Sequence, residues 1–186
     1  FARNMTRNMM STGKALPEIL DARLIQQRML KYKELAASFS YPEKEELRME
    51  YDRLFRLSEI WLYGAEYTAQ NEFQRAKELS DISGFYRAFG LKVDKDRPDA
   101  LSCQLEFMHY LIYKELYALK KNLSNAQEKA GTCRDAQKKF FQEYLYPAAK
   151  KIAEKVILAG GNDFYSKIAQ SLTAFLELEE ESMRAD

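Results

Sequence analysis

The sequence predicts an all-α fold, and three features of its composition support this prediction. Valine, isoleucine and threonine, the residue types on which β-strands draw most heavily, number only two, eight and five in 186 residues. Seven glycines and four prolines are too few for the many tight turns of a β-sandwich. Apolar residues, 46% of the chain, recur at helical spacing along most of it. We expect one helical bundle of about eight to ten helices.

The first helix is predicted to start near Pro17, because proline suits the first turn of a helix. Residues 1–14 show no helical pattern, and we expect a flexible N-terminal segment there, followed by a helical domain over 15–182. One apolar face then recurs at steps of three and four: Ile25, Met29, Tyr32, Ala36 and Phe39. Tyr41-Pro42 ends this helix, since the residue before proline avoids the α region.

A second helix is predicted from Glu43, with one apolar side formed by Leu47, Tyr51, Leu54 and Phe55. The helical period fails over 58–68, which contains Trp61, Tyr63 and Tyr67 and is predicted to be a loop or a broken helix. Aromatic rings outside a periodic core either line a ligand groove or pin down their own loop, and both interpretations stay open.

Helix is expected again over 68–79, and a further short helix ends at Gly90 as its C-cap. The linker-like stretch 92–98 is a candidate hinge. The strongest helix starts at Pro98 and is apolar nearly all round, which places it in the middle of the bundle. Its main stripe is Leu101, Leu105, Met108, Ile112, Leu116, Leu119 and Leu123.

The next break is predicted over 122–132, before a helix that Pro147 kinks or splits and that Gly160-Gly161 ends. Asn162 is the expected N-cap of the last helix. That helix is expected to bury Phe164, Ile168, Leu172 and Phe175. The acid-rich stretch 177–186 is predicted to be a solvated, mobile terminus.

Charge and cysteine content exclude several classes of protein. Lys plus Arg is 29 and Asp plus Glu is 28, so the basic excess of a nucleic-acid-binding domain is absent. No stretch approaches the roughly 20 apolar residues that span a bilayer. Cys103 and Cys133 form no C-x-x-C pair, so we expect buried structural thiols in a reducing cytoplasm.

The single histidine, His109, forms Glu106-x-x-His109 on the central helix. A ferritin-like di-iron site needs two such motifs, and the second histidine does not exist. A groove or core role is therefore predicted for His109, with no metal and no catalytic residue. Neither G-x-G-x-x-G nor a Walker A sequence occurs, so no cofactor is predicted.

Two segments resemble a known family when taken together: EYDRLF at Glu50–Phe55 and RPDALSCQLEFMHYL at Arg97–Leu111. The pair is similar to the E-Y-x-x-L-F and P-D-H-L-x-x-x-L-E-F-M motifs of the TorD/DmsD/NarJ family of cytoplasmic molybdoenzyme chaperones. Supporting matches are SYP at Ser40–Pro42, FYRAFGL at Phe85–Leu91 and FFQEYLYPAAKKIAEKV at Phe140–Val156. The chain departs from the family at Ala100, where histidine is frequent, and in lacking a proline-rich stretch after the first motif.

The resemblance implies a TorD/DmsD-like helical bundle that is not an enzyme. It implies binding of the twin-arginine leader and the apo form of a molybdenum-containing oxidoreductase precursor, which assists cofactor insertion and delays export. By position, the residues that correspond to leader-binding positions of the family are Tyr51, Leu54, Phe55, Pro98 and Asp99.

The chemistry of such a leader adds further candidates. Its two guanidinium groups favour carboxylates, which accept two parallel N–H bonds, and its apolar stretch needs a groove. Asp99 and Glu106, seven residues apart, are expected on one face of the central helix, and Asp52 and Glu66 are also available. Asp99 is equally an acid that favours a helix start without any ligand. Trp61 is added as an aromatic groove residue.

Two alternatives remain open at this stage. One is a helical-bundle metalloenzyme that uses Glu106-x-x-His109. The other is a helical ligand-binding or regulatory scaffold. The hinge at 92–98 would also permit exchange between protomers, which leaves a homo-oligomer open.

Overall fold

The computed structural model describes residues 12–93, 97–121, 124–161 and 163–185, the side chains of 12–21 and 163 excepted. No β-strand forms among these residues, which confirms the predicted all-α fold. The helices are α1 (Thr12–Ser38), α2 (Glu45–Phe55), α3 (Ala65–Thr68), α4 (Glu72–Ala88), α5 (Leu101–Lys120), α6 (Ala126–Phe140), the π-helical turn η1 (Phe141–Leu145), α7 (Tyr146–Ala159) and α8 (Asp163–Ala185).

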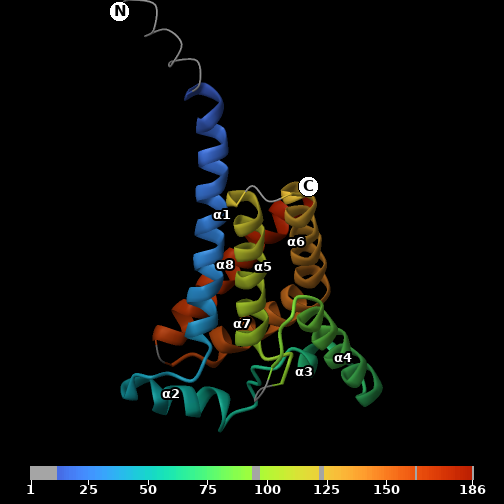
Figure 1. The fold of residues 1–186 in the computed structure, drawn as a ribbon. Helices are drawn as coiled ribbons and strands as arrows, with labels where there is room; N and C mark the ends of the chain where they lie inside the picture. Colours follow the sequence, from blue (N-terminus) through green and yellow to red (C-terminus); the bar gives the residue numbers. More distant parts are fainter. Residues whose placement is uncertain (1–11, 94–96, 122–123, 162, 186) are drawn as a thin grey trace, which may run out of the picture.

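The long helices form the body of the molecule (Figure 1). Helices α1, α5 and α6 lie side by side, with α5 packed against both of its neighbours, and α7 packs against α8 behind them. Helices α2, α3 and α4 lie at the lower end, around the start of α5. The first half of α5 is therefore surrounded by the segments that carry the sequence motifs.

Helix α5 lies at the centre of the core, as its nearly continuous apolar surface predicts. Leu105, Met108, Leu111 and Ile112 are all buried on it. An aromatic cluster joins α5 to α4 and α6, with ring centroids 4.8 Å apart both for Tyr86 with Phe107 and for Phe107 with Phe140. Edge-to-face pairs of this kind add about 0.5–1.5 kcal/mol each beyond the area they bury.

Several helix boundaries differ from the predicted ones, among them the start of α5, which is Leu101 and not Pro98. The stretch expected as two helices before Gly90 is the single helix α4, followed by Gly90 at a φ of 76°. Helix α6 starts at Ala126, so the predicted break over 122–132 is too long. Helix α1 starts at Thr12, which places Pro17 in its second turn. Residues 1–11 and 94–96, within the predicted flexible segment and hinge, lie outside the described residues, as does Asn162.

The predicted split at Pro147 is confirmed. The π-helical turn η1 connects α6 to α7, and Pro147 occupies the first turn of α7. Because proline has no backbone N–H, it fits a helix start and disturbs the hydrogen bonding of the turn before it. Gly160 ends α7, as predicted from the Gly160-Gly161 pair.

The last helix differs from its prediction in both face and ending. Its fully buried residues are Tyr165, Ala169, Leu172 and Leu176. The predicted residues Phe164, Ile168 and Phe175 are only partly buried and flank this stripe. The acid-rich stretch is not a solvated terminus, because α8 continues to Ala185 and Glu179 is 3% exposed.

Glu179 is buried because α1 supplies it with partners. Arg28 donates from Nε and Nη2 to the two carboxylate oxygens at 2.6 and 2.8 Å, and the Tyr32 hydroxyl donates at 2.8 Å. A buried carboxylate is tolerated when it is paired and hydrogen-bonded in this way. The pair fixes the C-terminal half of α8 to α1.

Cys133 is buried as predicted, whereas Cys103 is partly exposed. Among the described residues, no helix combines the length and the apolarity needed to cross a bilayer.

Candidate functional site

Asp99 lies in the corner before α5, whose first residue is Leu101, and its side chain is fully buried. Its carboxylate accepts hydrogen bonds from Arg97 Nε and Nη2 at 3.0 and 2.7 Å, and from the backbone N–H of Ala65 at 2.9 Å. The last contact caps the short helix α3, not α5. Because Asp99 is outside the helix, helical spacing does not place it on one face with Glu106, and that prediction is wrong.

Arg97 makes Asp99 part of a filled guanidinium site. Its Nη1 also donates to Glu66 at 2.6 Å, and its guanidinium lies 4.6 Å from the ring centroid of Tyr63. Glu66 in turn pairs with Arg75 at 3.0 Å. Burial alone would lower the pKa of Arg97, but its hydrogen bonds to Asp99 and Glu66 outweigh burial and raise that pKa. We call the cluster of Arg97, Asp99, Glu66, Tyr63 and Arg75 the Arg97 corner.

A hollow of about 280 Å³ lies beside this corner, between the end of α1, α2 and the start of α5. We call it the Tyr51 hollow, and its lining is Phe39, Ser40, Tyr41, Tyr51, Phe55, Arg56, Leu62, Tyr63, Ala100 and Ser102. Arg56 lies 4.5 Å from the ring centroid of Tyr41 and 6.0 Å from that of Tyr51, while its Nη1 is 3.0 Å from Asp52. A guanidinium of the chain itself therefore already lies over the rings of Tyr41 and Tyr51 in this hollow.

Two other predicted residues near the Tyr51 hollow do not line it. Leu54 is buried in the core. Trp61 is 45% exposed, and the Tyr67 hydroxyl donates to its backbone carbonyl at 2.8 Å. This bond supports the interpretation that the loop is pinned by its own rings, while leaving the indole at the surface.

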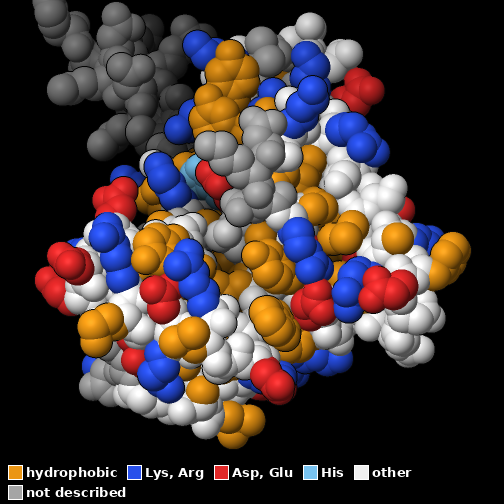
Figure 2. Space-filling view, turned by 90° about the horizontal axis from the view of Figure 1, so that it is seen from below, with side chains coloured by type: hydrophobic (Ala, Val, Ile, Leu, Met, Phe, Trp, Pro, Cys, Tyr) orange, Lys and Arg blue, Asp and Glu red, His pale blue; other side chains and the backbone are white. Residues whose placement is uncertain are grey.

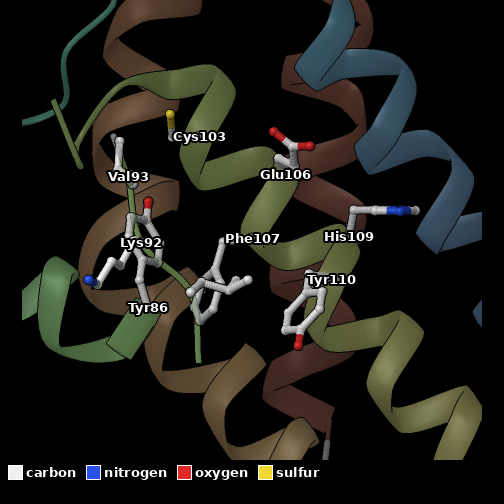
Figure 3. A pocket seen from close by; sticks show the side chains of 9 residues that line it. Tyr86, Lys92, Val93, Cys103, Glu106, Phe107, His109 and Tyr110 are labelled. Atoms are coloured by element: carbon white, nitrogen blue, oxygen red, sulfur yellow. The ribbon is translucent and has the colours of Figure 1, made fainter. Parts of the chain in front are cut away.

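A second cavity, of about 470 Å³, lies on the other side of α5 (Figure 3). We call it the Glu106 cavity, and its lining is Tyr86, Leu91, Lys92, Val93, Cys103, Glu106, Phe107, His109 and Tyr110. Predicted residue Pro98 lines a smaller adjoining hollow that shares Tyr86, Leu91, Lys92 and Val93 with it. The volume of the Glu106 cavity lies within the range of about 300–1,000 Å³ that is usual for ligand pockets.

Hydrogen bonds hold the walls of the Glu106 cavity in place. The Tyr86 hydroxyl donates to the Pro98 carbonyl at 2.7 Å, and the Tyr110 hydroxyl donates to the Phe89 carbonyl at 3.4 Å. Burial raises the pKa of Tyr86 well above its usual value, so this hydroxyl keeps its proton. The cavity is therefore built before any ligand enters.

His109 links the Glu106 cavity to α1, because its Nδ1 lies 2.9 Å from the carbonyl oxygen of Met29. A carbonyl only accepts, so Nδ1 carries the proton, and in the neutral ring Nε2 is left as an acceptor. Within the ranges that the structure describes, no group of three or more His, Cys, Asp or Glu side chains could hold a metal ion. The groove role predicted for His109 agrees with this position.

The predicted residues thus do not form one site. Tyr51 and Phe55 share one hollow, Asp99 belongs to the Arg97 corner, and Glu106 lies in the cavity on the far side of α5. Figure 2 shows positive, negative and hydrophobic side chains interspersed over the lower face of the molecule. The formal net charge of the whole chain is +1.

Sequence reasoning did not single out Arg97, although it is the first residue of the second motif. It also left out Cys103, Tyr110 and Lys92 of the Glu106 cavity. One face of α5 carries Cys103, Glu106 and Tyr110, which are spaced by three and four residues. This spacing is the sequence signal that predicts a shared site for them.

The family comparison covers both of the motifs described above. The family described as nitrate reductase delta subunit matches residues 21–153, most of the chain, so this protein belongs to that family of NarJ/TorD-type chaperones. The predicted resemblance is confirmed.

One characterised relative is the perchlorate reductase assembly chaperone protein of Dechloromonas aromatica (strain RCB). It is 29% identical over 109 residues, which are 56% of this chain and 46% of that protein. The chain therefore matches slightly less than half the length of this relative. The name of that relative describes it as an assembly chaperone.

Proposed function

We propose that this chain is a non-enzymatic chaperone for the assembly of a molybdenum-containing oxidoreductase. It binds the twin-arginine leader and the apo form of the precursor in the cytoplasm, assists cofactor insertion and delays export. The observation that carries the proposal is the family match over 21–153, which includes both motifs that line the hollows beside α5.

The surfaces beside α5 suit a peptide ligand. Both are concave and lined by aromatic side chains, with a few charged groups at fixed positions. An apolar leader stretch would supply most of the affinity by leaving water, and charge pairs would fix its register. Because ordering a disordered peptide opposes binding, the complex is expected to be reversible enough to release its client.

The client can be identified by co-purification of the full chain from its native host, followed by mass spectrometry. We expect the precursor of a molybdenum-containing oxidoreductase that still carries its leader. Calorimetry should then show saturable binding of the identified leader, and the same precursor without its leader should bind more weakly. Equal binding with and without the leader would contradict leader recognition, and turnover of a substrate by the isolated chain would contradict the chaperone proposal.

A further inference from the structure

Four carboxylates near the two motifs are available by sequence to read the leader's guanidinium groups, and the structure separates them. Asp99 is held by Arg97, and Glu66 by Arg97 and Arg75. Asp52 lies 3.0 Å from Arg56. A guest arginine at any of these three would have to displace an arginine of the chain that is already at high local concentration.

Glu106 is different. Its side chain is exposed, and it makes no hydrogen bond or ion pair with any residue that the structure describes. It projects from α5 at the rim of the Glu106 cavity, one turn from both Cys103 and His109 (Figure 3). Among the described residues, no cation is paired with this carboxylate, which lies beside a mostly apolar cavity.

We propose that the Glu106 cavity, and not the Tyr51 hollow, receives the start of the leader's apolar stretch, with Glu106 pairing one of the two adjacent guanidinium groups. This inference rests on the proposed function and specifies its binding site. The other guanidinium group stays in water, because adjacent side chains of an extended peptide point to opposite sides.

Charge also sets the direction of the peptide. Lys92 lies on the 91–93 segment beside α4, across the cavity from Glu106 and His109 (Figure 3). A cationic end is attracted to the Glu106 side and repelled from the Lys92 side. The apolar stretch then runs past Phe107 toward Leu91 and Val93.

The Tyr51 hollow is a poor site for the same end of the peptide. Arg56 lines it and covers the rings of Tyr41 and Tyr51, so an entering guanidinium would meet a like charge where it would otherwise stack. Electrostatics therefore distinguishes two hollows that both carry aromatic side chains.

Neighbouring residues on α5 provide a matched test, because Ser102 lines the Tyr51 hollow and Cys103 lines the Glu106 cavity. The probe is a fluorescein-labelled synthetic peptide with two adjacent arginines before an apolar stretch, measured by anisotropy with the full chain. We expect Cys103→Phe to weaken binding at least about tenfold by occupying the cavity, and Ser102→Phe to leave binding unchanged. If Cys103→Phe does not fold, as judged by its melting, Val93→Phe replaces it.

The charge is tested with a second peptide that carries neutral citrulline in place of both arginines. Glu106→Gln should weaken the arginine peptide about threefold, the effect of one exposed ion pair, and leave the citrulline peptide unchanged. Glu154→Gln, an exposed glutamate of α7, is the matched control with no effect. Loss of binding with Ser102→Phe but not with Cys103→Phe would overturn the site assignment and leave the proposed function standing. No saturable binding of either peptide would contradict leader recognition itself.

Discussion

The two sides of the first half of α5 show how similar side chains reach different states. On one side, the Arg97 corner and the Tyr51 hollow pair every candidate carboxylate with an arginine of the chain. On the other side, Glu106 has a cavity beside it, and no cation among the described residues is paired with its carboxylate. The comparison shows that a carboxylate already paired with an arginine of the chain acts as a structural residue. A carboxylate of the same type without such a pair can bind a ligand.

Burial explains this difference. Asp99 has no exposed surface, and an unpaired charge there would be very costly, so folding has to provide Arg97 and the Ala65 N–H. Glu106 is exposed, so water can solvate its carboxylate without a protein partner. It can therefore be left free for a ligand at little cost to stability.

The largest expected effect is a loss of stability on changing Asp99 in the Arg97 corner. Asp99→Asn keeps the shape of the side chain but removes one of the two carboxylates that pair with Arg97, and we expect a loss of about 3 kcal/mol in the free energy of unfolding. Urea denaturation followed by circular dichroism measures it. Glu106→Gln is the comparison on the other side and should change stability by no more than about 0.5 kcal/mol. Equal losses in both variants would mean that Glu106 is also a structural residue.

A smaller effect is expected from two tyrosine hydroxyls. Tyr86→Phe removes the hydrogen bond to the Pro98 carbonyl at the wall of the Glu106 cavity and should cost about 1 kcal/mol. Tyr165 packs against Tyr51 and Phe55 behind the Tyr51 hollow, and its buried hydroxyl has no hydrogen-bond partner among the described residues. Tyr165→Phe should leave the free energy of unfolding unchanged or raise it by up to about 1 kcal/mol.

The dependence of the free energy of unfolding on pH above 10 tests Tyr165 in a second way. Burial raises the pKa of Tyr165 to about 12, above the usual value of about 10. Between pH 10 and 12 the unfolded chain loses this proton while the folded chain keeps it, so stability falls as the pH rises. The fall should be shallower in Tyr165→Phe than in the unaltered protein. An identical slope in both would show that Tyr165 ionises alike in the folded and unfolded states.

Much of the fold could be predicted from the sequence, because helical periodicity reports burial directly. The stripe of α5 from Leu101 to Leu116 and the split at Pro147 are examples, while Leu123 of the predicted stripe lies outside the described residues. The face of α8 was missed because Phe164, Ile168 and Phe175 flank the true stripe at nearly the same spacing. The burial of Glu179 could not be foreseen, since it depends on Arg28, 151 residues away in the chain.

The candidate site was predictable only in part, for a related reason. The motifs point to Tyr51, Phe55 and Glu106, which do line hollows beside α5. A motif does not say which carboxylate is already paired, because pairing depends on contacts between distant segments, such as that of Arg97 with Glu66. Only the folded chain separates Asp99 from Glu106.

The most direct test of the central claim is protection of a single thiol from alkylation by iodoacetamide in the presence of saturating arginine peptide. Cys103 is partly exposed in the Glu106 cavity, whereas Cys133 is buried and serves as an internal reference in the mass spectrum. A Ser102→Cys, Cys103→Ser variant moves the thiol by one residue into the Tyr51 hollow. We expect the peptide to slow alkylation of Cys103 at least about tenfold, as expected when a bound ligand closes a pocket over most of its surface, and to leave the moved thiol unprotected. Protection of the moved thiol, with Cys103 still reacting freely, would contradict the account.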